Sequence, residues 1–284
     1  MLRVACCVIL KPHYATRNTQ YFNIAQPAFP YHVTQELMAG SGFLPAPPRP
    51  PQLGEHEVHV WLADLEGPQE STFANVLAPD EQARAARFHF EKDRRHYIAA
   101  RGVLRWLLGG YLGVTPESIE FQYNEHGKPW IAPKPPMKLE FNLSHSHGLA
   151  LYGFTLERRI GVDIEWMERK TPLEELAQRF FAPAEVAALM SMPKELRRNA
   201  FFNGWTRKEA FIKAHGIGLS LGLEKFAVSL EDNSPALLSM EGEPQAPARW
   251  TLRAFDTREG YAAALAVEGA ISQVKCWEWN GATE

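Results

Sequence analysis

The chain has 284 residues, of which 45% are hydrophobic and 22% are charged, with a formal net charge of -3 and a pI near 6.4. This composition is typical of a globular protein that can bury a substantial core, and its charge balance gives no sign of nucleic acid as a partner. No apolar run approaches the roughly 18 residues that a membrane helix needs, so we expect no membrane association.

The cysteines and the N-terminus indicate a protein of a reducing compartment. Cys6, Cys7 and Cys276 predict neither a disulfide framework nor a metal site, which favours the cytoplasm. The short apolar run VACCVIL ends at Lys11 without a small-residue cleavage pattern, so we expect no secretory signal. Residues 1–54 are rich in Pro and Gly towards their end and are expected to form an irregular extension.

The first half of the chain predicts strands around a helical region. The alternating sequence EVHVWLADL at residues 57–65 predicts the first strand. Pro79 and Asp80 mark a helix start, and the helical apolar stripe within residues 77–113 predicts two helices that end at glycines. Further strands are expected at residues 119–124, 138–148 and 149–156, with a turn at 125–130.

The second half repeats this plan loosely. GVDIEWM (161–167) reads as a strand, and a capping box at Thr171 and Glu174 predicts a helix that breaks near Pro183. A long helix is expected over residues 194–216, and strands at 226–230, 249–255, 261–267 and 274–279. Helices and antiparallel strands in two successive halves predict the α+β class.

Two carboxylates stand close together in GVDIEWM. Asp163 and Glu165 are two positions apart in a strand, so their side chains share a face. Neighbouring carboxylates raise each other's pKa unless positive charge lies between them. Mg²⁺ is a common partner for such a pair and also takes phosphate oxygens. The alternative is a solvent-facing strand with two surface acids, and the pair by itself favours that simpler interpretation.

A second motif lies on the long helix. Trp205, Glu209 and Lys213 recur at helical spacing, so they lie along one stripe. A carboxylate and a lysine one turn apart suit a metal ion and a phosphate. The alternative is an exposed Glu–Lys pair with Trp205 in the core, and Lys208 lies beside the stripe. The glycines of HGIGLSLGL predict a shaped loop after the helix.

A third motif, FNLSHSHG, ends a strand in small donors and imidazoles. Ser144 and His145 are groups that bind phosphate oxygens. A zinc site at His145 and His147 is an alternative, but no third ligand follows at a suitable spacing. A serine hydrolase with Ser144 as nucleophile is another alternative, although the G-x-S-x-G elbow is missing. The turn HGKPW presents Lys128.

Together, the ordered motifs GKP, FNLSHS, GVDIE and FFNGWTRKEAFIKAHGIGL resemble the 4′-phosphopantetheinyl transferases of the larger, Sfp-like type. The resemblance covers residues 57–267. It implies two similar halves, residues 55–157 and 158–284, each a small antiparallel sheet with a long helix. The halves would pack side by side with the active site in the cleft between them.

The resemblance also implies the reaction. Such enzymes transfer the phosphopantetheine arm of coenzyme A to a serine of an acyl or peptidyl carrier protein, releasing adenosine 3′,5′-bisphosphate. Asp163, Glu165 and Glu209 would hold Mg²⁺, or Mn²⁺, against the pyrophosphate. Glu209 is also the expected general base, directly or through a water, and Lys213 would contact a pyrophosphate oxygen during catalysis.

Coenzyme A binding is implied at further positions. Ser144 and His145 would contact its phosphates, together with Lys213. Lys128 would lie near the adenine end, and Lys92, within a basic helical stretch, near the 3′-phosphate. Lys208 would help to position phosphate or carrier, and Trp205 would support the helix beneath the site. His147 stands where the family commonly carries a small residue, and we expect it to point to solvent.

The expected partner is an acidic carrier protein of fatty-acid, polyketide or nonribosomal-peptide biosynthesis. Docking is expected around Phe180 and Phe181 with the basic pair Arg197 and Arg198. A cytoplasmic monomer is expected, because one chain carries both halves of the site. Two other functions compete with this interpretation, a non-catalytic nucleotide- or metal-binding protein and a Mg²⁺-dependent phosphohydrolase of coenzyme A-like compounds.

Overall fold

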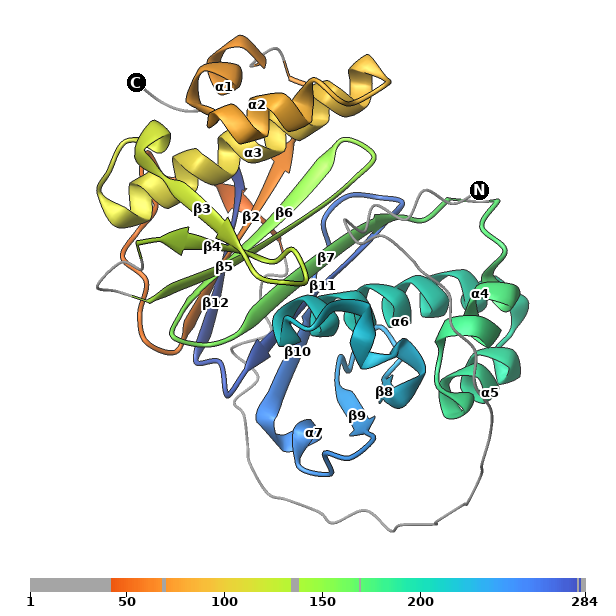
Figure 1. Ribbon diagram of the computed structural model, residues 1–284. Coiled ribbons are helices and arrows are strands. Elements are labelled where there is room, and N and C mark those ends of the chain that lie inside the picture. The colour runs from red at the N-terminus through yellow and green to blue at the C-terminus, as the bar shows by residue number, and fades with distance from the viewer. Residues whose placement is uncertain (1–41, 68–69, 134–137, 169, 280, 282–284) are drawn as a thin grey trace.

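The structure is a computed structural model that describes residues 42–67, 70–133, 138–168, 170–279 and 281. Most of the expected N-terminal extension lies outside these residues. Within the described part, Leu44–Pro45 form a short strand, β1, and Leu53 is buried in the core of the first half. Two main sheets, each accompanied by one long helix, pack against each other (Figure 1), which confirms the α+β class.

The first half is built on a five-stranded sheet in the order β1-β12-β2-β6-β5. The strands β2, β6 and β5 are successive antiparallel neighbours, with β5 at the edge, whereas β12 runs parallel to both β2 and β1. The C-terminal strand therefore returns to the first sheet, and the division at residues 157 and 158 stays a prediction. The strands span Glu57–Asp64 (β2), Leu139–Ser146 (β5), Leu149–Leu156 (β6) and Gln273–Trp279 (β12).

Helices cover one face of this sheet. The long helix α3 ends at Gly113, whose left-handed backbone lets its N–H donate to the carbonyl of Gly109. Glycine therefore ends the helix as predicted, although Gly109 and Gly110 lie inside it. The other elements of this half are α1 (Glu70–Val76), α2 (Pro79–Ala85), α3 (Glu91–Leu112) and a hairpin of β3 (Glu120–Tyr123) and β4 (Pro129–Ala132).

The second half has a three-stranded antiparallel sheet in the order β10-β11-β7, crossed by the long helix α6 (Lys194–His215). The predicted break near Pro183 is confirmed, because α4 ends at Phe180 and α5 begins at Pro183. The remaining elements are β7 (Ile160–Trp166), α4 (Leu173–Phe180), α5 (Pro183–Ser191), β8 (Phe226–Val228), β9 (Leu237–Met240), α7 (Ala246–Arg249), β10 (Trp250–Ala254) and β11 (Tyr261–Glu268).

The two sheets lie face to face between the long helices. Successive residues of β2 point to opposite faces, and both faces are buried. Trp61 joins the core beneath α3, whereas Val60 joins the core shared with Val162 of β7. The far side of the second sheet packs on α6 through Phe211. The layers therefore run α3, five-stranded sheet, three-stranded sheet, α6.

The capping box predicted at Thr171 and Glu174 is wrong. The helix begins at Leu173 with Pro172 at its N-cap, and the Thr171 hydroxyl has no hydrogen-bond partner. A carboxylate cap is found one helix later, where the backbone N–H of Ala182 donates to the Glu185 side chain at 2.7 Å. No helix in the described part of the chain combines the length and apolarity that a bilayer crossing requires.

Candidate active site

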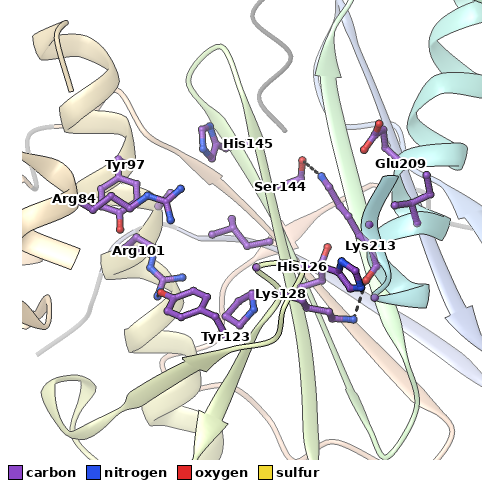
Figure 2. Close-up of a pocket in the computed structure, with 18 residues that line it drawn as sticks. Arg84, Tyr97, Arg101, Tyr123, His126, Lys128, Ser144, His145, Glu209 and Lys213 are labelled. Carbon is purple, nitrogen blue, oxygen red and sulfur yellow. Dashed lines mark hydrogen bonds between the residues drawn. The ribbon is translucent and has the colours of Figure 1, made fainter. Parts of the chain in front are cut away.

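A pocket of about 200 Å³ opens between the two halves of the molecule. The first half contributes α2, α3, the β3–β4 hairpin and β5, and the second half contributes α6 (Figure 2). Five of the eight predicted site residues line it, namely Lys128, Ser144, His145, Glu209 and Lys213. Residues from four distant stretches of the sequence therefore meet in one cavity.

Side chains of β5 join the two sheets beside this pocket. The Val162 backbone N–H donates to the Asn142 amide oxygen at 2.9 Å. Further along β5, Ser144 Oγ donates to Asp163 at 2.8 Å. Ser146 Oγ then donates to Glu165 at 3.0 Å. We call these three contacts the β5–β7 seam, because they join edge strands of different sheets.

Asp163 is the most constrained carboxylate of the site. It is 2% exposed, and its Oδ1 lies 2.6 Å from Lys213 Nζ and accepts the hydrogen bond from Ser144. Lys213 also donates to Ser144 Oγ at 2.9 Å, so the three groups form a closed triangle. The other oxygen of Asp163, Oδ2, is buried and accepts no hydrogen bond.

Gly161 sets the distance between β7 and α6. A Cβ at this position would lie 2.1 Å from the carbonyl oxygen of Ala210 and 2.4 Å from the backbone nitrogen of Ala214. These two alanines directly follow Glu209 and Lys213. The missing side chain at Gly161 therefore lets the helix approach closely enough for Lys213 to reach Asp163.

Negative charge accumulates at this end of the seam. Burial, followed by the charge of Asp163, raises the pKa of Glu165 to about 8, and the charge of Glu209 acts in the same direction. Glu209 itself is 4% exposed. Among the described residues, however, no three His, Cys, Asp or Glu side chains converge as a preformed metal site. The ammonium of Lys213 is the cation found on Asp163.

Lys128 reaches across from the first half to the end of α6. Its Nζ donates to the carbonyl oxygens of Lys213 at 2.9 Å, Ile160 at 3.1 Å and Ala214 at 3.4 Å. Burial lowers its pKa to about 8. The Asn124 amide donates to the carbonyl of Gly216 at 3.0 Å, so the β3–β4 hairpin holds the helix end at two places.

His145 and Lys92 differ in their surroundings. Burial, followed by the nearby charge of Lys213, lowers the pKa of His145 to about 4, so its imidazole is neutral at pH 7. Lys92 lies outside the pocket lining, where its ammonium pairs with Glu66 at 2.8 Å on the surface. His147 is exposed, as expected.

The pocket also contains Arg84 and Arg101 of the basic helical stretch, in which one or two phosphate contacts were expected. It further contains three residues to which the sequence assigned no role, Tyr97, Tyr123 and His126. Arg101 and Arg105 lie one helical turn apart on α3, and both donate to the buried carboxylate of Glu81. Arg101 is thereby fixed at the wall of the pocket. The i, i+4 spacing of the two arginines predicts that they lie on the same face of the helix. Nothing in the sequence predicts that both pair with Glu81 on another helix.

Two expectations about the second half are wrong. Lys208 does not face phosphate or carrier, because it is fully buried and its Nζ donates to Glu185 at 2.6 Å and to the carbonyl of Phe226 at 2.6 Å. Phe181 is 3% exposed and belongs to the core, so it offers no docking surface. The core position expected for Trp205 is confirmed.

Comparison with known proteins places this geometry in context. Residues 67–152 match a model described as "4′-phosphopantetheinyl transferase, N-terminal", and residues 159–266 match the 4′-phosphopantetheinyl transferase superfamily. The 4′-phosphopantetheinyl transferase HetI of Nostoc sp. is 41% identical over 84% of this chain and 98% of its own. Sfp of Bacillus subtilis is 27% identical over 69% of this chain and 84% of its own.

Proposed function

The chain belongs to the 4′-phosphopantetheinyl transferase superfamily, and we propose that it transfers the phosphopantetheine arm of coenzyme A to a serine of a carrier protein. The observation that carries this function is the meeting of Ser144, Glu209 and Lys213 in one pocket. Asp163 is bonded to Ser144 and Lys213 beside this pocket. Such a site offers hydrogen-bond donors to a pyrophosphate. Its carboxylates can bind a cation and accept a proton.

The carboxylates fit a divalent cation. Asp163 Oδ2 is buried without a hydrogen-bond partner, and burial, followed by the charge of Asp163, raises the pKa of Glu165. We assign Asp163, Glu165 and Glu209 as ligands of Mg²⁺ or Mn²⁺, the hard cations that oxygen donors prefer. When bound, the ion would neutralise charge on the pyrophosphate as a Lewis acid.

The transfer step uses two residues of α6, Glu209 and Lys213. The acceptor serine Oγ bonds to the phosphorus that carries the pantetheine arm, and the bond from this phosphorus to the bridging oxygen breaks. The electron pair leaves with adenosine 3′,5′-bisphosphate, and the serine proton passes to Glu209, directly or through a water. Lys213 stabilises the negative charge that grows on the leaving phosphate.

The remaining contacts orient coenzyme A. Ser144 and neutral His145 offer hydrogen bonds to phosphate oxygens, because each can donate one proton. We place Lys128 near the adenine end and Lys92 near the 3′-phosphate. For Lys128, the three carbonyl contacts support a second role, which is to hold the end of α6 where Lys213 begins.

The assembly and partners follow from the same arrangement. One chain contributes both walls of the pocket, so we propose a monomer that acts in the cytoplasm on acyl or peptidyl carrier proteins. The physiological carrier belongs to fatty-acid, polyketide or nonribosomal-peptide biosynthesis, and a panel with one carrier from each class identifies it.

The decisive experiment incubates the protein with apo-carrier, coenzyme A and Mg²⁺ and follows the carrier by mass spectrometry. The expected result is the phosphopantetheine mass increment, absent from a carrier whose acceptor serine is replaced by alanine. Release of adenosine 3′,5′-bisphosphate without carrier modification would instead establish the phosphohydrolase. Glu209→Gln should abolish transfer with the fold intact, whereas Glu175→Gln, at an exposed position on α4, should not change it.

A further inference from the structure

Ser146, the last residue of β5, has no role in the transfer described above, yet its hydroxyl is fully engaged across the β5–β7 seam. The residue is 7% exposed. Its Oγ donates to Glu165 Oε2 at 3.0 Å and accepts from the backbone N–H of Trp166 at 3.1 Å. One hydroxyl thus contacts both the carboxylate of Glu165 and the backbone immediately after it.

This contact matters because β7 is an edge strand. Its neighbour in the sheet is β11, so the N–H groups on the other edge find no strand partner there. Ser146 satisfies the N–H of Trp166, as Asn142 satisfies that of Val162. The two side chains hold β7 against β5 near its two ends.

Repulsion from the neighbouring acid Asp163 opposes the observed orientation of the Glu165 side chain. Asp163 lies on the same strand, is held by Ser144 and Lys213, and carries like charge. Lys213 is near enough for its charge to act on Glu165, but the hydrogen bond that the Glu165 carboxylate accepts comes from Ser146 at 3.0 Å. Without that hydrogen bond, rotation of the Glu165 carboxylate away from Asp163 and towards solvent would reduce the repulsion between the two acids.

We propose that Ser146 is a positioning residue that fixes the Glu165 carboxylate for a divalent cation. This inference rests on the proposed function, because it takes Glu165 as a metal ligand. Groups that orient a ligand typically contribute about 10- to 100-fold to metal affinity. The contribution of Ser146 to metal affinity comes from its hydroxyl group and not from the volume of its side chain.

A matched pair of variants separates these two properties. Ser146→Thr keeps the hydroxyl, and Ser146→Val has the same branched shape without it. Mn²⁺ binding is measured by electron paramagnetic resonance without coenzyme A, beside thermal unfolding of each variant. We expect Ser146→Val to bind Mn²⁺ about 10-fold more weakly than Ser146→Thr. Ser146→Ala should behave as Ser146→Val does.

A control serine lies at the other end of the molecule. Ser272 is exposed, and its Oγ donates to the carbonyl of His56 at 3.0 Å. Ser272→Ala should leave Mn²⁺ affinity unchanged. In the transfer assay, the Ser146→Val enzyme should need more Mg²⁺ for half-maximal rate, with kcat largely restored at saturating Mg²⁺.

The outcomes distinguish this inference from the proposed function. Equal Mn²⁺ affinities for Ser146→Thr and Ser146→Val would overturn the positioning role, even if the wild-type enzyme modifies carriers. Weaker binding by Ser146→Val alone would support it, even if no carrier is modified and the proposed function fails. A fall in unfolding temperature that is the same for both variants, without a difference in Mn²⁺ binding, would show a structural role only.

Discussion

Lys213 Nζ lies 2.6 Å from Asp163 Oδ1, so an ion pair connects the long helix of the second half to the strand that carries both acids. The carboxylate side chain is 3% exposed and the lysine side chain 20% exposed. Ser144 of the first half bonds to both partners. The ion pair therefore lies where the two halves meet. Its lysine ammonium is bound to a carboxylate, that of Asp163, which we assign as a metal ligand.

Removing this lysine should make the protein more dependent on divalent cations. Lys213→Met leaves Asp163 buried with Ser144 as its remaining partner among the contacts described above, and we expect a loss of about 2–4 kcal/mol in unfolding free energy. Added Mn²⁺ should raise the unfolding temperature of this variant more than that of the wild type, because the ion supplies the missing charge. Transfer should fall by about 100-fold or more.

The control is Lys225→Met, at an exposed position, for which all three effects should be absent. Equal Mn²⁺ shifts for wild type and Lys213→Met would show that the ion does not take the place of the ammonium group.

A methyl group at Gly161 should disturb both stability and catalysis. It would lie 2.1 Å from a carbonyl oxygen of α6, so the helix must move away from β7. We expect Gly161→Ala to cost about 2–4 kcal/mol of unfolding free energy and to reduce kcat/KM at least 10-fold. Gly67→Ala, which meets nothing within 4 Å, serves as the control. Unchanged transfer by a destabilised Gly161→Ala enzyme would refute the link between helix approach and catalysis.

Local signals in the sequence predicted most of the elements. Alternation located β2, glycine marked the ends of α3 and α6, and the strands β6 and β11 were also predicted. The return of β12 to the first sheet left no such signal, because pairing between strands far apart in the chain depends on the whole fold. The antiparallel pattern of the other strands gave no hint of its parallel register.

The site was predictable to a similar extent. Motifs identified Ser144, Glu209 and Lys213, which line one pocket in the structure. The partners that position them were not evident, because Gly161 looks like any strand glycine and Lys208 looks like a surface lysine. Only tertiary contacts reveal that Gly161 meets the helix backbone and that Lys208 is buried.

Lys128 should contribute to stability before any ligand binds. Its ammonium contacts three carbonyl oxygens, two of them in the last turn of α6, where positive charge is favourable. Lys128→Met should therefore lower unfolding free energy by about 1–2 kcal/mol without coenzyme A. Calorimetry with coenzyme A then reports any direct ligand contribution. A variant with wild-type stability and weakened coenzyme A binding would show that the lysine acts on the ligand alone.

The buried pair Lys208–Glu185 should be one of the most sensitive sites of the second half. Lys208→Met leaves a carboxylate with backbone donors only, from Ala182 and Val228, and should cost about 3–5 kcal/mol. Adding Glu185→Gln should recover part of this loss, because the amide oxygen can still accept while the charge is gone. Denaturant titration of the single and double variants measures the coupling.

An exposed ion pair serves as the control for these single and double variants. Lys138 and Glu157 lie 3.8 Å apart on the surface, so Lys138→Met should change stability by less than about 0.5 kcal/mol. Strict additivity of the two substitutions at Lys208 and Glu185 would mean that the pair does not act as a unit.

His59 should make the fold sensitive to mild acid. Burial is the main cause that lowers its pKa to about 4, against an ordinary value of 6.5. Its Nδ1 lies 2.8 Å from the hydroxyl of Tyr111, which accepts from Trp61 Nε1 and has its own proton to donate to a neutral His59. A proton on Nδ1 would remove that acceptor. Between about pH 6.5 and 4 the unfolded chain thus binds the proton and the folded chain does not.

Because only the unfolded chain binds this proton, the folded state loses stability as the pH falls. Stability is full above about pH 6.5 and falls as pH drops towards 4, by about 2 kcal/mol at pH 5 from this one group. His59→Asn keeps an acceptor for Tyr111 and should flatten the pH dependence of the unfolding free energy, even if it is less stable at pH 7. His89→Asn, at an exposed position, should leave the slope as it is. Identical slopes for wild type and His59→Asn would show that His59 is not the group responsible.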